Sequence, residues 1–228
     1  MLAACYQFHA HAAETNLIIE INPKGPAYSP SNPVHEINLL AAGSWSEPVS
    51  DSQGNRLRGR LVVYDGIHQT NVVRKGVWTT APVYLEIQEM TTANQHPTRI
   101  YFDLLEGPKF ELRDAKGATA DNLPHHAFRG GMPRPFWATV PAGGLLRLRA
   151  DAANGISEGS DGELRLCFLD LKGHQSNTSW TIPVGDTNIW FLSAILLPPP
   201  PTSSIPYNPG VWQGRLEFPA VKLSLVKH

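Results

Sequence analysis

The fold is decided by the stretch of residues 83–88, Val-Tyr-Leu-Glu-Ile-Gln, in which apolar and polar side chains alternate. Successive side chains of a β-strand point to opposite faces, so Val83, Leu85 and Ile87 are predicted to face a core. Glu86 falls on the other face and is predicted to point to water. The pattern is typical of a half-buried strand in a sheet that has one wet face.

The same alternation recurs along the whole chain and predicts about nine strands, which suit an antiparallel arrangement. The other segments are Leu17 to Ile21, Leu61 to Tyr64, Ile100 to Leu104, Lys109 to Arg113, Leu146 to Arg149, Leu164 to Phe168, Trp190 to Leu196 and Val221 to Leu225. The 20 prolines and 19 glycines favour turns over helices. One short helix is predicted at His35 to Ala42. The fold class is therefore all-β, an antiparallel two-sheet sandwich with long loops.

The 228 residues, of which 42% are hydrophobic, are enough for one sizeable core. Residues 15–228 are predicted to form a single β-sandwich domain. Residues 1–14 are interpreted as a truncated leader or a flexible N-terminus, because Ala10-His11-Ala12 resembles a signal-peptidase site. This favours a secreted or periplasmic location. Leu2 to Cys5 also has the form of a lipobox, so lipid anchoring through Cys5 is a minor alternative. The other cysteine, Cys167, is interpreted as an unpaired thiol on a strand.

Composition and missing motifs exclude several functions. A net charge of -1 without a basic run argues against nucleic acid as a partner, and no apolar stretch is long enough for a transmembrane segment. His35-Glu36 lacks a second histidine at position 39, which is leucine, so the zinc-protease helix is absent. No phosphate-binding loop or nucleophile elbow occurs. We therefore predict no catalysis, no cofactor and no metal, although His125-His126 leaves a surface metal site open as a weaker alternative.

Aromatic and arginine side chains near long loops are the candidate binding residues. The segment from Arg129 to Trp137 joins Arg129, Arg134, Phe136 and Trp137 in the composition of an interface anchor. Trp180 is added as a second exposed aromatic. The six tryptophans could alternatively stack on sugar rings, or they could fill the core, for which Trp190 and Trp212 are the first choices.

The order of four segments resembles a known family. Val83 to Met90, Arg99 to Leu104, Phe110 to Gly117 and Val140 to Leu148 resemble the immunoglobulin-like domains of exported bacterial proteins, including those like the intracellular proteinase inhibitor of bacilli. The ending, Gly210 to Leu223, resembles the closing hairpin of uncharacterised secreted planctomycete-type proteins. The resemblance implies an immunoglobulin-like sandwich and export, and no inhibitory residue is carried over.

These observations predict a non-catalytic, exported binding or structural module. Its partner is predicted to be another envelope or extracellular protein, contacted through loops or an exposed sheet edge. Two alternatives stay open: a carbohydrate-binding module that uses exposed tryptophans on a polysaccharide, and an enzyme of unrecognised type.

Overall fold

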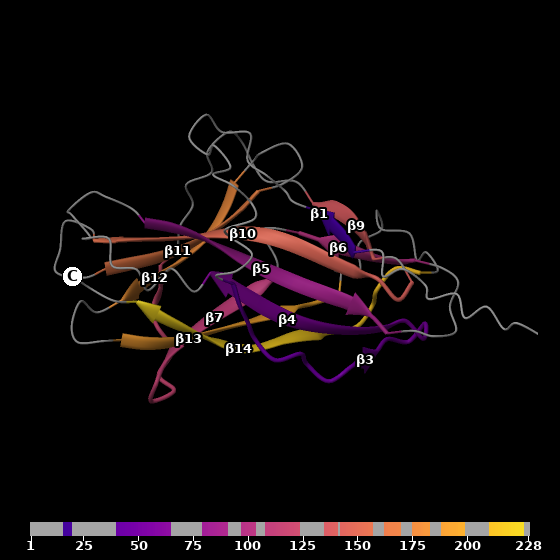
Figure 1. Ribbon diagram of the computed structural model, residues 1–228, viewed down its shortest axis with the longest axis horizontal. Helices are drawn as coiled ribbons and strands as arrows, with labels where there is room; N and C mark the ends of the chain where they lie inside the picture. Colours follow the sequence, from indigo (N-terminus) through magenta and orange to yellow (C-terminus); the bar gives the residue numbers. More distant parts are fainter. Residues whose placement is uncertain are drawn as a thin grey trace, which may run out of the picture.

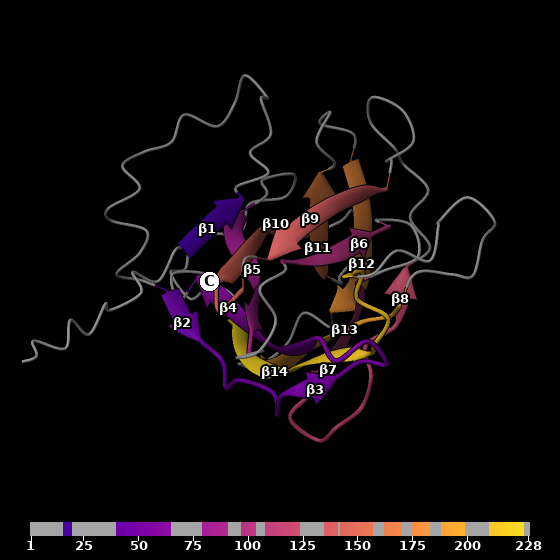
Figure 2. The same cartoon turned by 90° about the vertical axis from the view of Figure 1, so that its right-hand side faces the viewer.

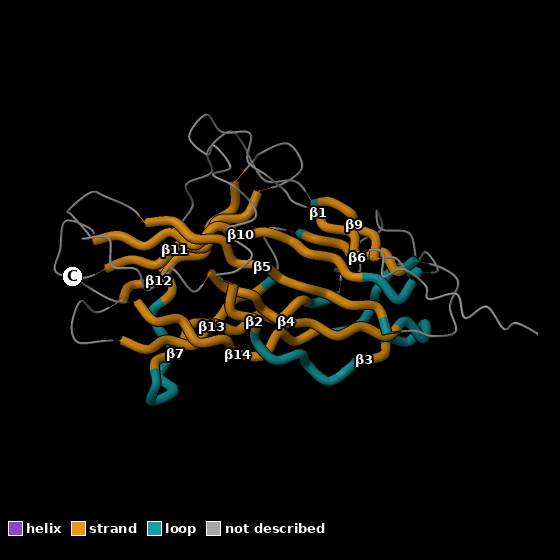
Figure 3. The backbone as a smooth tube through the Cα atoms, viewed as in Figure 1, coloured by secondary structure: helices purple, strands orange, loops and turns teal. Residues whose placement is uncertain are grey.

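The structure is a computed structural model that describes residues 16–19, 40–64, 79–90, 97–103, 108–123, 135–140, 142–156, 162–169, 175–182, 188–198 and 210–225. Within these ranges every regular element is a β-strand (Figure 3). The all-β prediction is confirmed for this part of the chain. None of its elements is a helix with the length and apolar character needed to cross a bilayer.

The largest sheet has nine strands, and its longest members run side by side through the middle of the molecule (Figure 1). Its main path is β2-β4-β5-β10-β11-β12-β8, with β3 paired to β4 and β1 paired to β10. All its pairings are antiparallel except that of β1 with β10. The bounds are β1 Asn16–Ile19, β2 Leu40–Ala42, β3 Val49–Ser50, β4 Arg56–Tyr64, β5 Thr79–Glu89, β8 Asn122–Leu123, β10 Leu145–Ile156, β11 Gly162–Leu169 and β12 Gln175–Ile182.

Two smaller antiparallel sheets complete the described fold. One has the order β14-β13-β7 and comprises β7 Lys109–Asp114, β13 Asn188–Leu196 and β14 Leu216–Leu225. The other is a two-stranded ribbon of β6 Thr98–Phe102 and β9 Phe136–Val140. The backbone of β6 also bonds to residues 210–212 through its other edge.

One hydrophobic cluster connects the three sheets. It includes Leu85 of β5, Phe102 of β6 and Leu192 of β13, each 0% exposed. The nine-stranded sheet and the β14-β13-β7 sheet meet where β14 lies beside β4 (Figure 1, Figure 2). There Gly59 leaves room for the ring of Phe218, because a Cβ on Gly59 would lie 2.8 Å from that ring. The apolar faces predicted from alternation therefore share one core.

A tight turn follows β7. The Asp114 carboxylate accepts hydrogen bonds from the backbone N–H groups of Lys116 and Ala118, each at 2.8 Å. Gly117 has a φ of 87°, in the left-handed region that glycine adopts without a steric cost. The aspartate at the start and the glycine near the end thus reverse the chain.

Each of the nine predicted strand segments overlaps a strand of the structure, but several further strands were not predicted. The short helix predicted at His35 to Ala42 is wrong, because residues 40–42 form β2 and pair with β4. Residues 122–123 form another strand that was not predicted, β8, which pairs with β12. Three-residue and two-residue strands such as these carry too few side chains for alternation to be recognised.

A second correction concerns Glu86. It was predicted to point to water, but its side chain is 0% exposed, like Val83, Leu85 and Ile87 on the opposite face. β5 lies inside the sheet, with β4 on one side and β10 on the other. Long side chains from both neighbouring strands therefore cover the polar face of β5.

Candidate functional site

The first candidate surface lies on the outer face of the β6–β9 ribbon and consists of Arg99, Tyr101 and Trp137, here called the ribbon surface. The three side chains are partly exposed. Tyr101 and Trp137 are paired across the strands, and their rings meet edge to face with centroids 5.1 Å apart. The guanidinium carbon of Arg99 lies 4.7 Å from the centroid of the Trp137 ring. A cation and two aromatic rings therefore form one contiguous patch.

The ribbon keeps its apolar side chains on the opposite face. Phe102 and Phe136 are paired across the strands and stack with centroids 5.3 Å apart and an interplanar angle of 21°. Phe136 is only 6% exposed. Because neighbouring residues of a strand point in opposite directions, Phe136 faces the core and Trp137 faces outward.

One edge of β9 pairs with β6, and the other edge pairs with no strand among the residues that the structure describes. The backbone groups of Arg99 point away from β9, because its N–H donates to Gly210 O at 2.7 Å and its C=O accepts from Trp212 N at 2.8 Å. Its cross-strand neighbour Thr139 is then in a non-hydrogen-bonded pair, and so is Trp137 two residues before it. The N–H and C=O groups of Trp137 and Thr139 therefore point away from β6, and in the described part of the chain β9 pairs with β6 alone.

Burial raises the pKa of the Tyr101 phenol above its usual value of 10.0, and the charge of Asp103 raises it further. The folded state then holds the phenol proton more tightly than the unfolded state does. This contribution to stability is complete below about pH 10 and is lost as the pH rises through the folded-state pKa.

We therefore expect the free energy of unfolding of the wild type to fall more steeply than that of Tyr101→Phe above about pH 10. Urea denaturation at a series of pH values between about 8 and 11 measures this difference. Parallel curves for the two proteins would show that Tyr101 titrates as in the unfolded chain.

Of the five residues predicted to bind, the structure describes three, and it does not bring these three onto one surface. Trp137 lies on the ribbon surface, whereas Phe136 and Trp180 are buried, Trp180 at 1% exposure, so neither ring is available to a partner in this fold. Arg129 and Arg134 lie outside the described residues, as do His125 and His126. Arg99 and Tyr101 were missed as binding residues, although they alternate on a predicted strand, because the register with Trp137 could not be read from the sequence.

The tryptophans divide between core and surface. Trp190 and Trp212 are 6% and 1% exposed, which confirms their predicted place in the core. Trp45 and Trp137 are partly exposed; Trp45 lies between β2 and β3, and Trp137 lies on β9. Trp78 lies outside the described residues. The described tryptophans therefore form no flat platform of three exposed rings.

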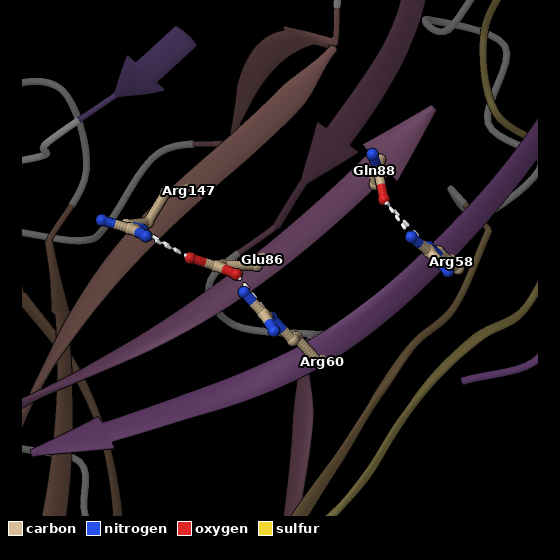
Figure 4. A network of polar contacts seen from close by, with 5 residues as sticks. All are labelled: Arg58, Arg60, Glu86, Gln88 and Arg147. Carbon is tan, nitrogen blue, oxygen red and sulfur yellow. Dashed lines mark hydrogen bonds and ion pairs between the residues drawn. The ribbon is translucent and has the colours of Figure 1, made fainter. Parts of the chain in front are cut away.

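The second candidate surface is a row of charged and polar side chains across β4, β5 and β10 (Figure 4), here called the arginine row: Arg58, Arg60, Glu86, Gln88 and Arg147. Arg60 and Arg147 are the register neighbours of Glu86 on its two sides. Arg60 Nε donates to Glu86 Oε2 at 2.6 Å, and Arg147 Nε donates to Oε1 at 2.7 Å. Arg147 Nη2 also contacts Oε1.

Neighbouring groups hold the remaining members of the arginine row. Arg58 donates from Nε and Nη2 to Gln88 Oε1, at 2.9 and 2.6 Å. The guanidinium carbons of Arg58 and Arg60 lie 4.7 and 4.4 Å from the ring centroid of Trp45. That of Arg147 lies 5.4 Å from the ring centroid of Tyr84. Each arginine is thus oriented by one oxygen acceptor and one aromatic ring.

Comparison of the chain with protein-family models, with curated proteins and with solved structures finds no match. The structure shows a mostly β-strand protein with antiparallel sheets, and the comparisons identify no family. The immunoglobulin-like resemblance stays a prediction from the residues.

A third polar cluster lies around Asp51, and its carboxylate oxygens already accept hydrogen bonds from other residues of the chain. The Asp51 carboxylate accepts from the N–H groups of Gln53, Asn55 and Gln213, at 2.9, 2.9 and 3.1 Å. Nearby, the buried Thr98 hydroxyl donates to Glu89. These bonds tie the β3–β4 turn to residues 210–213. Among the described residues, no group of three or more His, Cys, Asp or Glu side chains is placed to hold a metal ion.

Proposed function

We propose that the chain is a non-catalytic, exported binding module with an immunoglobulin-like sandwich fold, and that it contacts another envelope or extracellular protein through the ribbon surface. The antiparallel sheets and their shared core support the sandwich. The leader-like residues 1–14 support export. The observation that carries the binding role is Trp137, which is partly exposed on a strand whose outer edge pairs with no other described strand.

The mode of binding follows from the edge of β9. Its outward N–H and C=O groups offer a ladder on which an extended segment of a partner can add as a strand. Trp137 and Tyr101 supply rigid aromatic area beside that ladder, and such residues dominate the energy of many interfaces. The partner segment would gain main-chain hydrogen bonds and aromatic contacts together.

The charge of the surface indicates an acidic partner. Arg99 stacks on Trp137 with no carboxylate bonded to it among the described residues. Arg129 and Arg134 precede β9 in the sequence and add two positive charges to the same segment. We therefore propose an extended segment with acidic side chains, because opposite charges steer the encounter and fix the register.

A random peptide library displayed on phage and selected on the purified protein tests this function. The selected peptides should carry acidic residues among alternating apolar ones. Trp137→Ala should weaken their binding by about 2 kcal/mol, roughly 30-fold, because it removes the central aromatic anchor. Calorimetry with a synthetic selected peptide measures the loss.

Two further variants distinguish strand addition from non-specific binding. Thr139→Pro removes an N–H that points away from β6, so it should abolish peptide binding while the ribbon stays paired. Ile189→Ala truncates an apolar side chain that is 37% exposed on β13 and should leave binding unchanged. Peptides that bind equally well to the wild type, Trp137→Ala and Thr139→Pro would contradict the proposal.

A saturable fluorescence change with a soluble polysaccharide, lost in Trp137→Ala, would indicate that the ligand is a carbohydrate and not a protein.

A further inference from the structure

Strand β13 carries apolar side chains on both of its faces. The inward set belongs to the shared core, and its members are at most 6% exposed: Trp190, Leu192, Ala194 and Leu196. The outward set is here called the β13 face, and four of its five members are apolar: Ile189, Phe191, Ser193, Ile195 and, directly after the strand, Leu197. Such a continuous apolar run is typical of a strand that is covered on both sides.

The folded chain leaves the β13 face partly open to solvent. Ile189 and Leu197 are 37% and 36% exposed, and they are the large hydrophobic side chains that stand out as exposed in the described part of the chain. Phe191 and Ile195 are partly exposed. Because β13 lies between β14 and β7, these side chains form a stripe along the centre of a sheet face. A contiguous apolar stripe on a protein surface marks a site of association.

Charged side chains of both signs border the β13 face. They come from the neighbouring strands: Lys109, Glu111 and Arg113 from β7, and Arg215, Glu217 and Lys222 from β14 and the residue before it. An apolar centre with a polar rim is the anatomy of a protein–protein interface. A rim of mixed sign fits a protein better than an anionic membrane or a nucleic acid, which attract clusters of positive charge.

The charges beside Ile195 favour a second copy of the chain as the partner. The strand register places Lys109 on one side of Ile195 and Glu217 on the other. We propose that the β13 face packs on the β13 face of a second copy, related by a twofold axis that runs along β13 between the two sheets. This rotation exchanges the two sides of the stripe, so that Lys109 of each copy lies over Glu217 of the other. Stacked sheets lie about 10 Å apart, a gap that a lysine and a glutamate side chain span together.

The described contacts leave both members of this ion pair free to form it. Lys109 has no carboxylate bonded to it among the described residues. Arg215 contacts Glu217 through Oε1 alone, at 2.9 and 3.0 Å, which leaves Oε2 for the lysine of the second copy. At the other end of the stripe Arg113 lies over Lys222 of the second copy, but Glu111 is bonded to Arg113 at 2.8 Å and offsets that repulsion.

Sedimentation velocity of the whole chain tests the dimer. At concentrations up to about 100 μM the wild type should show a monomer–dimer equilibrium, and Phe191→Asp should weaken dimerisation by about 100-fold or more, because it buries a charge in the apolar centre. The circular dichroism spectrum of Phe191→Asp should equal that of the wild type, which shows that the loss is not one of folding. The inference does not depend on the proposed function, because the β13 face and the ribbon surface lie on different sheets, so peptide binding should also be unchanged.

Charge reversal tests the twofold arrangement. Lys109→Glu and Glu217→Lys should each weaken the homodimer by about tenfold, because each creates two like-charge contacts per dimer. An equimolar mixture of the two variants should associate about as tightly as the wild type, since both contacts again join opposite charges. The matched control is Lys116→Glu, the same reversal in the exposed turn after β7, which should leave the homodimer unchanged. Its mixture with Glu217→Lys has the same net charges but should associate more weakly than the first mixture.

Four results would overturn the inference. A wild type that stays monomeric at every concentration forms no such dimer. A dimer that Phe191→Asp forms equally well uses another surface. A mixture of Lys109→Glu and Glu217→Lys that associates no more tightly than either variant alone contradicts the twofold arrangement. A monomeric wild type that co-sediments with phosphatidylglycerol vesicles, and loses this binding in Phe191→Asp, would assign the β13 face to a lipid surface instead.

Discussion

Replacing Glu86 with alanine is expected to lower the free energy of unfolding by about 3–5 kcal/mol, since a buried carboxylate is removed from two guanidiniums. Arg60 and Arg147 would then face each other across β5 without the charge that separates them. Both lie less than a third exposed, so water compensates for only part of the loss. Urea denaturation followed by circular dichroism measures the change.

The control for this prediction is Glu217→Ala, which breaks an ion pair with Arg215 whose partners are 61% and 56% exposed. An exposed pair contributes little, so a change of less than about 1 kcal/mol is expected. If Glu86→Ala costs no more than Glu217→Ala, the row of Figure 4 does not contribute to the stability of the sheet.

The second large effect is expected at Trp180, whose replacement by alanine should cost about 3–5 kcal/mol. Its ring is 1% exposed and is among the largest fully buried side chains of the protein. It lies on β12 opposite Leu164 of β11, which is also 1% exposed. Truncation would leave a cavity that strands held in register on both sides cannot close. Thermal unfolding followed by circular dichroism measures the loss.

Trp45→Ala is the matched control, because it removes the same side chain from a partly exposed position. It should cost about 1–2 kcal/mol, chiefly through the lost contacts with Arg58 and Arg60. A cost for Trp180→Ala as small as that for Trp45→Ala would show that Trp180 is not part of the core, and would return it to the candidate binding residues.

The candidate site could be predicted only in part. Phe136 and Trp137 were assigned to one contact loop, but they are consecutive residues of β9, and a strand sends them to opposite faces. If β9 had been recognised as a strand, Trp137 would have been predicted as the exposed residue of the two and Phe136 as the buried one. Arg99 and Tyr101 come from β6, far from β9 in the sequence, and only the register of the ribbon places them beside Trp137.

Alternation along each strand is a local property, and the sequence by itself therefore determined the β class, the nine main strands and the inward face of Val83, Leu85 and Ile87. The neighbours of each strand were decided by the tertiary structure alone. Glu86 is polar by sequence and buried by its position between β4 and β10, where Arg60 and Arg147 meet it in register. Pairing between distant segments depends on the packing of the whole core, and for that reason both candidate surfaces appear only in the folded chain.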